Sequence, residues 1–256
     1  MPQKEIRVMT ISEIASELKM PYTRNNSQIL IDEARHTQMS YEEFLKRILE
    51  GELELRKENS VKNRLRYARF PYKKFLEDFD VSKYDPELRI KFNELNTLSF
   101  IKEKENVILI GSPGSGKTHY SIGLGIKACM EGMKILFISV PNLIIELKEA
   151  MSLNQLTAYK RKFEKYDAVI LDELGYVSFD KEGCEILFNL LSNRNDKGTI
   201  IITTNLAFDR WEEIFKDPML TGAIVDRLAH KAHIMDMSRE TSYRYEETIT
   251  WLNSKK

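Results

Sequence analysis

The sequence has little cysteine, no long apolar run and no excess of charge of either sign. Its 256 residues include two cysteines, Cys129 and Cys184, and neither belongs to a CxxC pair. This argues against a disulfide framework and a thiolate metal site, so we expect buried thiols and no structural metal. No apolar stretch approaches the roughly 20 residues that a membrane-spanning helix requires. Residues 1–5 also lack the apolar core of a signal peptide, and we expect a cytoplasmic protein.

Overall charge does not indicate a partner, because 39 Lys and Arg residues balance 39 Asp and Glu residues. Evidence for nucleic-acid binding must therefore come from local clusters. Residues 56–74 form one basic cluster, with Glu58 as its only acid, and residues 153–166 form another, with Glu164 as its only acid. The basic members of the first are Arg56, Lys57, Lys62, Arg64, Arg66, Arg69, Lys73 and Lys74, and those of the second are Lys160, Arg161, Lys162 and Lys165.

The first 68 residues are polar and carry helix signals. The segment Ser40-Tyr41-Glu42-Glu43 is a capping box that starts a helix, and we expect Gly51 to end or interrupt that helix. Pro71 predicts a boundary, because the residue before a proline disfavours the helical conformation. The chain also exceeds the usual single-domain size. We therefore expect a small all-helical N-terminal domain, residues 1–68, followed by a larger domain, residues 69–256.

From Asn106 onward, short apolar runs alternate with amphipathic helices. The runs are rich in Val and Ile and are bounded by charged residues or glycine, which is typical of strands buried on both faces of a parallel sheet. The pattern predicts an α/β domain of three layers, with helices on both sides of the sheet. The expected strands are 107–110, 135–140, 168–171 and 199–203, and the expected helices are 117–130, 142–151, 155–165, 181–195 and 208–215.

A phosphate-binding motif of the form G-x-x-x-x-G-K-[ST] follows the first expected strand. Its glycines allow backbone N–H groups to face a phosphate, and the start of the next helix adds partial positive charge. We expect the Lys117 ammonium to reach the β- and γ-phosphate oxygens and the Thr118 hydroxyl to ligate Mg²⁺. The sequence therefore predicts a site for ATP and Mg²⁺ built on Gly111, Ser112, Pro113, Gly114, Ser115, Gly116, Lys117 and Thr118.

Polar residues follow two other expected strands. Asp172 and Glu173 come directly after the run 168–171. Beside a P-loop, we expect Asp172 to hold Mg²⁺ and Glu173 to polarise the attacking water. Asn205 closes the run that begins at residue 199, and it would lie near the γ-phosphate if that strand lies between the other two. Asn205 could then orient the water, and the sequence predicts hydrolysis of ATP to ADP and phosphate.

These residues resemble a known family, the AAA+ ATPases. Within it they resemble the IstB-type helper ATPases of insertion-sequence transposition, which are kin to DnaC helicase loaders and DnaA initiators. The resemblance extends over nearly the whole chain. Beyond the P-loop, the most specific segments are 68–71 (ARFP), 76–80 (LEDFD), 159–167 (YKRKFEKYD), 172–176 (DELGY), 224–228 (IVDRL) and 242–244 (SYR).

The resemblance implies an AAA+ fold with strand order 5-1-4-3-2 and homo-oligomers whose ATP sites lie between subunits. Arg227 then matches the arginine finger that one subunit offers to its neighbour; without the resemblance it is an ordinary arginine on a helix surface. Only 19 residues follow Met237, so we expect a truncated lid. Arg244 is the better match for the second sensor arginine, which also contacts the nucleotide, and Arg239 is the alternative.

Two more sets of residues take their roles from the resemblance. Phe75 and Phe79 match a linker that packs near adenine in initiator-type relatives, although ordinary core aromatics would fit the sequence equally well. The interval 142–165 matches an extra helix that meets DNA in relatives, and a solvated helix face is its alternative. The expected DNA contacts are Lys160, Arg161, Lys162 and Lys165.

The function expected from the sequence is that of an ATP-dependent DNA-binding helper. It would oligomerise on duplex DNA without sequence preference and recruit or activate a transposase, with ATP as a switch. The N-terminal domain would dock the partner or DNA. A DnaC-like loader of a replicative helicase is the alternative within the same fold. A P-loop kinase of small molecules fits less well, because it does not account for the paired carboxylates Asp172 and Glu173, for Asn205, or for the basic cluster of residues 56–74.

Overall fold

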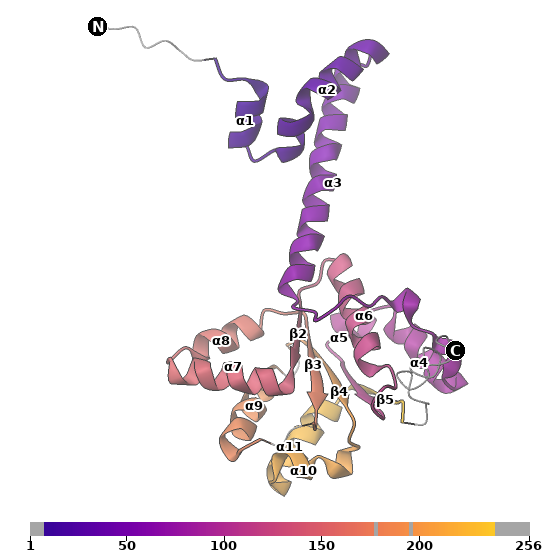
Figure 1. Cartoon of the computed structure of the whole chain (residues 1–256), viewed down its shortest axis with the longest axis vertical. Coiled ribbons are helices and arrows are strands. Elements are labelled where there is room, and N and C mark those ends of the chain that lie inside the picture. The colour runs from indigo at the N-terminus through magenta and orange to yellow at the C-terminus, as the bar shows by residue number, and fades with distance from the viewer. Residues whose placement is uncertain (1–7, 177–178, 195–196, 239–256) are drawn as a thin grey trace, which may run out of the picture. The chain divides into compact units, whose positions relative to one another are not determined.

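The computed structural model describes residues 8–176, 179–194 and 197–238 (Figure 1). Contacts within the chain divide it into two compact units, Met1–Asn63 and Arg64–Lys256. This boundary lies slightly before the expected one between residues 68 and 69, because Leu65 and Ala68 pack against the core of the second unit. In the described ranges, no helix is long and apolar enough to cross a membrane.

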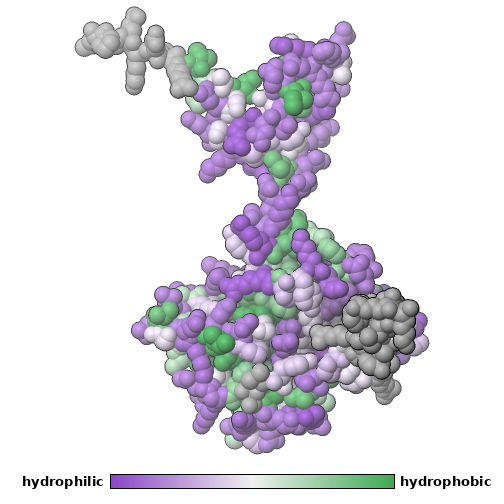
Figure 2. Space-filling view, viewed as in Figure 1, coloured by the Kyte–Doolittle hydropathy of each residue, from purple (hydrophilic) through white to green (hydrophobic). Residues whose placement is uncertain are grey.

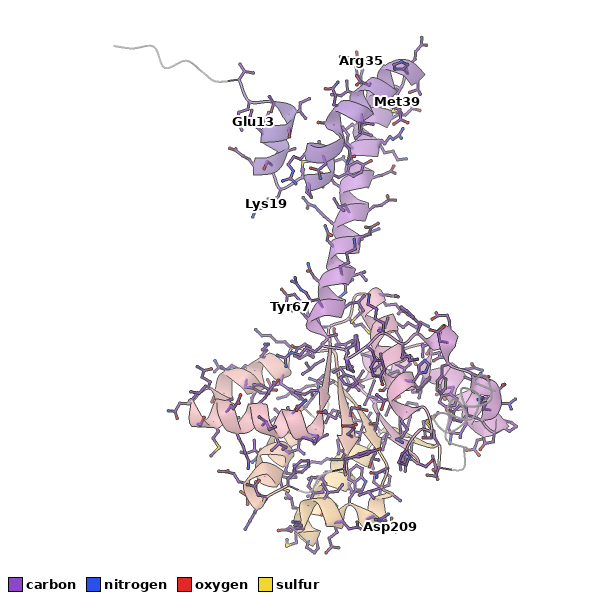
Figure 3. The ribbon with its side chains drawn as sticks, in the orientation of Figure 1. Glu13, Lys19, Arg35, Met39, Tyr67 and Asp209 are labelled. Atoms are coloured by element: carbon purple, nitrogen blue, oxygen red, sulfur yellow. The ribbon has the colours of Figure 1, made fainter. Side chains whose placement is uncertain are left out.

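Two helices of the N-terminal unit begin at reciprocal caps, and the helix between them begins without a side-chain cap. Thr10 Oγ1 accepts a hydrogen bond from the Glu13 amide, and the Glu13 carboxylate accepts one from the Thr10 amide. Ser40 and Glu43 cap the next helix start in the same way, as the sequence predicts. Such pairs satisfy amide groups that have no partner inside the helix. The helices are α1 (Ile11–Glu17), α2 (Pro21–Thr37) and α3 (Tyr41–Tyr67), with Tyr67 at the end of α3 (Figure 3).

The expected break at Gly51 is wrong, since α3 continues through this residue. An added Cβ at Gly51 would lie 2.1 Å from the ring of Tyr22 in α2. The glycine therefore allows α2 and α3 to approach closely. The pattern of apolar residues in the sequence does not show such a contact between two helices. Next to it, the Glu52 carboxylate is 4% exposed and accepts a hydrogen bond of 2.7 Å from the amide of Thr23 near the start of α2.

The larger unit has the α/β architecture that the apolar runs predict. Its strands are β1 (Asn106–Ile110), β2 (Ile135–Ser139), β3 (Ala168–Leu174), β4 (Thr199–Thr204) and β5 (Ala232–Asp236). Before β1 lie η1 (Leu76–Asp78), η2 (Val81–Lys83), α4 (Pro86–Leu95) and α5 (Ser99–Glu103). The remaining helices are α6 (Lys117–Met130), α7 (Val140–Ser152), α8 (Leu156–Phe163), α9 (Lys181–Arg194), η3 (Phe208–Arg210), α10 (Glu212–Phe215) and α11 (Pro218–Ala229).

The five strands are parallel and lie in the order β2-β3-β4-β1-β5. This is the expected order 5-1-4-3-2 read from the other edge, and it is confirmed. Side chains alternate between two cores, because neighbouring residues of a strand point to opposite faces. Val107 and Leu109 pack with α4, α5 and α6, whereas Ile108 and Ile110 pack with α7, α9 and α11. The helices therefore cover both faces of the sheet (Figure 1).

The elements differ from the expected ones mainly in the last third of the chain. β3 extends to Leu174, with an irregular register between Leu171 and Leu174. The expected helix over 208–215 divides into η3 and α10. The apolar runs placed neither α11 nor β5, although the resemblance implies a fifth strand. β5 escapes the pattern of buried strands because it lies at the sheet edge and is only partly buried.

The surface of the described residues is mostly hydrophilic, with apolar patches scattered over it (Figure 2). Several of the exposed apolar side chains belong to the N-terminal helices, among them Ile14, Ile29, Leu45, Leu49 and Leu53. The N-terminal unit therefore buries little of its apolar surface by itself. Its core consists of Ala15 and Leu30, which are both at most 5% exposed.

Candidate functional site

The P-loop connects β1 to α6 and is supported by aromatic residues. Gly116 has a φ of +87°, and an added Cβ there would lie 2.8 Å from Tyr84 Oη and 2.9 Å from the ring of Phe79. Tyr84 Oη also donates a hydrogen bond of 2.8 Å to the carbonyl of Ser115. Only glycine fits this conformation and this contact without strain. The loop is therefore held in its shape before any ligand is considered.

Lys117 lies at the first position of α6 and points into the loop. The residue is 6% exposed. Its Nζ donates hydrogen bonds of 2.8 Å to the carbonyls of both Gly111 and Ser112. A buried ammonium beside a ring of backbone amides is suited to an anionic ligand, because burial weakens the screening of its charge.

Three side chains from three neighbouring elements meet at one carboxylate oxygen. Asp172 Oδ1 accepts hydrogen bonds from Thr118 Oγ1 at 2.9 Å and from Thr203 Oγ1 at 2.6 Å. The carboxylate is buried, and it follows the apolar part of β3. A carboxylate next to a threonine hydroxyl is an oxygen donor set that suits Mg²⁺. Thr203 was not predicted from the sequence; its place at the end of the expected central strand was the available signal.

Glu173 occupies a strained position in the β3 bulge. Its φ is +64°, in the left-handed region, and its side chain is exposed. The pairing of β3 with β4 is interrupted here, and the Glu173 amide donates a hydrogen bond of 3.0 Å to Thr203 Oγ1 instead of to a strand carbonyl. Bulges re-aim side chains, and left-handed non-glycine residues cost about 1–3 kcal/mol. The strain therefore marks Glu173 as a candidate functional residue.

Asn205 follows β4, and it is not among the residues that line the cavity beside the P-loop. β4 runs between β1 and β3, so the residue after β4 emerges between the P-loop and Asp172. Asn205 Oδ1 is buried and has no hydrogen-bond partner within the described part of the chain. An added Cβ on Gly175 would lie 3.3 Å from this oxygen. The amide is thus packed against the turn that follows Glu173.

A cavity of about 240 Å³ opens beside the P-loop. It reaches from Lys117, Thr118 and Glu173 to a region lined by His119 and by part of the segment before α4, namely Tyr72, Lys74, Asp78, Phe79, Asp80, Lys83 and Tyr84. Burial lowers the pKa of His119, and its Nε2 lies 3.1 Å from the carbonyl oxygen of Phe75. The imidazole is therefore neutral at pH 7 and donates its proton to that carbonyl. Charged phosphate-binding groups occupy one end of the cavity and mixed aromatic and polar groups the other.

The two phenylalanines expected near adenine differ in placement. Phe79 lines the cavity, but its ring also belongs to a buried cluster with Tyr84, Phe92 and Tyr120. Phe75 is 37% exposed and is not among the residues that line the cavity. Phe79 therefore lines the cavity and is also a core aromatic. The carbonyl of Phe75 contacts His119, and the Phe75 side chain does not line the cavity.

The residues present fit a bound nucleoside triphosphate with a divalent cation. Lys117 and the backbone of Gly114, Ser115 and Gly116 line the same cavity and supply positive charge and N–H donors. Thr118 and Asp172 supply oxygen ligands for Mg²⁺. A wider groove of about 630 Å³ shares Thr118, Asp172 and Glu173 with this site and is bounded by β2, α7 and the segment 69–72.

Arg227 lies far from the P-loop of its own chain. It is exposed on α11, its guanidinium stacks 4.6 Å from the ring centre of Phe188, and it donates a hydrogen bond to Ser192. It shares a small cavity with Asn106, the first residue of β1, whereas the P-loop follows the last. The length of β1 separates them by about 16 Å. Arg239 and Arg244 lie outside the described residues.

The expected DNA contacts lie at the carboxyl end of α8. Arg161, Lys162 and Lys165 are exposed, and Lys160 is half-buried. The acid of this segment, Glu164, forms an ion pair of 3.7 Å with Lys197 rather than with its own helix. The basic groups therefore share one short, solvent-facing segment.

Two arginines of the basic cluster at residues 56–74 bond to groups within the larger unit. Arg64 Nε donates a hydrogen bond of 2.7 Å to the carbonyl of Cys129. Arg69 pairs with Glu146 of α7 at 2.7 Å, and the second oxygen of Glu146 accepts a hydrogen bond from Tyr159 of α8. Arg64 and Arg69 therefore bond to groups inside the larger unit.

Comparisons with known proteins agree on the family. The model of the IstB-like ATP binding protein family matches residues 14–250. The chain is 37% identical, over 91% of its length and 88% of the relative, to an insertion sequence IS21 putative ATP-binding protein of Pseudomonas aeruginosa. It is 34% identical, over 93% of its length and 94% of the relative, to an insertion sequence IS5376 putative ATP-binding protein of Geobacillus stearothermophilus.

Solved structures agree on the fold. The DnaC helicase loader aligns with a TM-score of 0.52 and 18% identity over 68% of this chain and 98% of the loader. The replication initiator DnaA, bound to AMPPCP and single-stranded DNA, aligns with a TM-score of 0.56 and 16% identity over 70% of this chain and 55% of the initiator. The larger unit thus has an AAA+ P-loop fold, and the chain belongs to the IstB-like ATP-binding protein family.

Proposed function

We propose that this protein is an ATP-hydrolysing, DNA-binding AAA+ ATPase that oligomerises on duplex DNA and recruits or activates a transposase. The observation that carries the proposal is the convergence of Lys117, Thr118, Asp172 and the strained Glu173 beside one cavity. Binding alone does not require a strained carboxylate next to the phosphate site. A general base for hydrolysis must be aimed at a water molecule, and a carboxylate held beside the phosphate site can fill that role.

Each residue of the site has a separate task in this proposal. Lys117 and the P-loop amides hold the β- and γ-phosphates. Thr118 and Asp172 hold Mg²⁺, which supplies charge neutralisation when bound. Glu173 takes a proton from the attacking water, and Asn205 orients that water through its side-chain amide. Phe79 and His119 bound the end of the cavity that would receive the base.

The distance between Arg227 and its own P-loop supports the proposed oligomerisation. A guanidinium about 16 Å away along β1 cannot reach the γ-phosphate of the same subunit. We propose that Arg227 enters the groove beside Thr118 and Glu173 of a neighbouring subunit, where it stabilises the charge of the transition state. Hydrolysis then depends on assembly.

DNA binding is assigned to α8. Arg161, Lys162 and Lys165 are exposed together, and Glu164 is drawn away by Lys197. Contacts of Lys and Arg with phosphates carry no sequence information, which suits a protein that must load on many targets. The N-terminal unit is the proposed docking surface for the partner, and a cytoplasmic location suits such a task.

The transposition function is favoured over a helicase-loader function by the relatives. Proteins of insertion sequences are up to 37% identical and cover most of both chains, whereas the loader shares the fold at 18% identity. The names of these relatives say ATP-binding and insertion sequence; transposase recruitment is our proposal. A small-molecule kinase is the weaker alternative.

Salt dependence of DNA binding tests the proposal. Arg161→Glu with Lys162→Glu should weaken binding to duplex DNA and reduce the slope of log K against log salt by about 0.9 for each phosphate that is no longer neutralised. ATP affinity should not change. Lys102→Glu with Lys104→Glu, an equal charge change on exposed positions at the end of α5, is the control and should keep the slope.

Two outcomes would contradict the proposed function. An unchanged slope in the α8 variant would exclude phosphate contacts by this helix. ATP turnover that ignores duplex DNA but rises with a small metabolite would favour the kinase. Stimulation of turnover by duplex DNA alone supports the proposal.

A further inference from the structure

We propose that Thr203 is a positioning residue that sets the geometry of both carboxylates through one hydroxyl group. Its Oγ1 donates a hydrogen bond of 2.6 Å to Asp172 Oδ1 and accepts one of 3.0 Å from the amide of Glu173. The hydroxyl thus binds the side chain of one carboxylate residue and the main chain of the next. The inference rests on the proposed ATPase function.

The direction of both hydrogen bonds is fixed by chemistry. An amide N–H can only donate, so Thr203 Oγ1 must accept from Glu173. The hydroxyl has a single proton, and the role that remains for it is to donate to the carboxylate of Asp172. A hydroxyl can fill these two roles at once, whereas a methyl group can fill neither.

The main-chain bond matters because Glu173 is in an unfavourable conformation. Its φ of +64° lies in a bulge where the ladder between β3 and β4 is interrupted. Thr203 Oγ1 replaces the strand carbonyl that the Glu173 amide would otherwise need. Without the hydroxyl, the bulge can relax toward a regular strand. Since side chains alternate along a strand, such a relaxation re-aims the Glu173 carboxylate.

Packing alone does not account for a threonine at this position. Thr203 is 2% exposed and stands in the strand Thr199–Thr204, where three isoleucines precede it. Valine has the same shape and would be cheaper to bury, because a buried hydroxyl must be satisfied by hydrogen bonds. Both hydrogen bonds of this hydroxyl go to the carboxylate pair. The hydroxyl is therefore explained by the site and not by the core.

Three variants separate this role from a structural one, each measured as the full chain with duplex DNA and Mg-ATP. Thr203→Val should lower kcat about 10- to 100-fold while KM for ATP changes less than about threefold, because misaimed catalytic groups lose transition-state contacts and keep ground-state ones. Thr203→Ser restores the hydroxyl and should return kcat to within about threefold of the unmodified protein.

Thr199→Val is the matched control. Thr199 is buried in the same strand, and its hydroxyl donates to the carbonyl of Phe100 at the opposite end of the sheet. Its kcat should stay within about twofold of the unmodified protein. In single-turnover assays, Thr203→Val should cause a smaller loss when added to Glu173→Gln than in the unmodified protein, since the bond to the Glu173 amide then no longer aims a base and only the bond to Asp172 remains to be lost.

The possible results distinguish failure of the inference from failure of the proposed function. A Thr203→Val protein with full kcat, a Thr203→Ser protein as slow as Thr203→Val, or a rise of KM alone would overturn the inference. Thr203→Ala replaces Thr203→Val if the latter shows no cooperative melting. If Glu173→Gln itself hydrolyses ATP normally, the role of Glu173 as base fails and the inference fails with it; if the unmodified protein does not hydrolyse ATP, the proposed function fails instead. If Glu173→Gln is inactive while Thr203→Val is fully active, only the role of Thr203 fails.

Discussion

The central sheet has one edge at which the strands begin and another at which they end, and polar side chains have different partners at these two edges. At the carboxyl-terminal edge, Thr118, Asp172 and Thr203 converge, and Glu173 is held in a strained conformation. At the amino-terminal edge, Asn106 accepts a hydrogen bond from the Ile200 amide and donates one to the carbonyl of Leu228. Side chains at the first edge bond to one another as well as to the main chain, whereas Asn106 at the second bonds to main-chain groups.

Arg194 illustrates the second pattern most fully. Its guanidinium is buried and donates hydrogen bonds to the carbonyls of Phe163, Tyr166 and Thr199. Burial lowers the pKa of Arg194 to about 10. An arginine whose donors all serve the backbone is a structural clamp, here between the end of α8 and the start of β4. A buried charged side chain is therefore not by itself a sign of function in this protein. Asp172 is a candidate because it lies beside other polar and strained residues of the site, whereas Arg194 is not.

The largest effect is expected at the carboxyl-terminal edge. Lys117→Ala should abolish ATP binding, because the triphosphate charge loses its buried partner. Glu173→Gln should bind ATP normally but hydrolyse it roughly 10²–10⁴-fold more slowly, since shape is kept and the base is lost. Nucleotide titration and single-turnover hydrolysis distinguish the two. Equal loss of binding in both variants would mean that their roles are misassigned.

Arg227 is the residue that could break the comparison, because it lies toward the amino-terminal edge and yet is proposed to serve catalysis. Arg227→Ala should bind ATP and lower hydrolysis by about 10³-fold. Mixed with Glu173→Gln protein on DNA, it should regain part of the activity, since an intact site can borrow Arg227 from its neighbour. Each variant alone is the control. A mixture that stays inactive would exclude the shared site.

Arg194 should affect stability and not catalysis. Arg194→Met keeps length and removes the donors, leaving buried carbonyls unpaired, and should lower the free energy of unfolding by about 3 kcal/mol. Urea denaturation measures this change. Arg210→Met is the control, because Arg210 pairs with Glu213 on the surface and should matter by less than about 0.5 kcal/mol. Equal losses in the two variants would contradict the clamp.

Two glycines give the smallest expected effects, with opposite signs. Gly175 has a φ of +100° and its added Cβ would lie 2.9 Å from Leu206, so Gly175→Ala should destabilise the protein by about 1–2 kcal/mol. Gly222 lies within α11 and an added Cβ would meet nothing within 4 Å. Gly222→Ala should stabilise by about 0.5–1 kcal/mol. Thermal unfolding measures both. A Gly175→Ala protein as stable as the unmodified one would contradict the strain at Gly175, and a destabilised Gly222→Ala protein would contradict the expectation for Gly222.

Much of the fold could be predicted from the sequence. The apolar runs place β1 to β4, and the P-loop pattern places the start of α6 at Lys117, because buried parallel strands and phosphate loops have strong local signatures. β5 is partly buried and lacks such a signature. Gly51 misled the prediction because a propensity scale records the cost of glycine in a helix but not its use at a crossing with Tyr22.

The site was predictable in the members that belong to sequence motifs, the uncharged Thr118 among them. Lys117, Asp172 and Glu173 are recognisable from motif and spacing alone. Thr203 and Tyr84 are not, because their contribution depends on which strand and which loop lie beside them in space. The strain at Glu173 is likewise invisible in the sequence, since it arises from a register irregularity between two strands.

The conformation of Glu173 means that the stability of the fold and the proposed hydrolysis of ATP favour different residues at this one position. A left-handed position favours glycine over glutamate by roughly 1 kcal/mol, because glycine has no Cβ to clash. Selection for a more robust fold would therefore replace this residue with glycine and remove the proposed base. A chain that keeps glutamate at φ +64° accepts a permanent thermodynamic cost. Laboratory libraries screened only for thermal robustness would be expected to lose the carboxylate first.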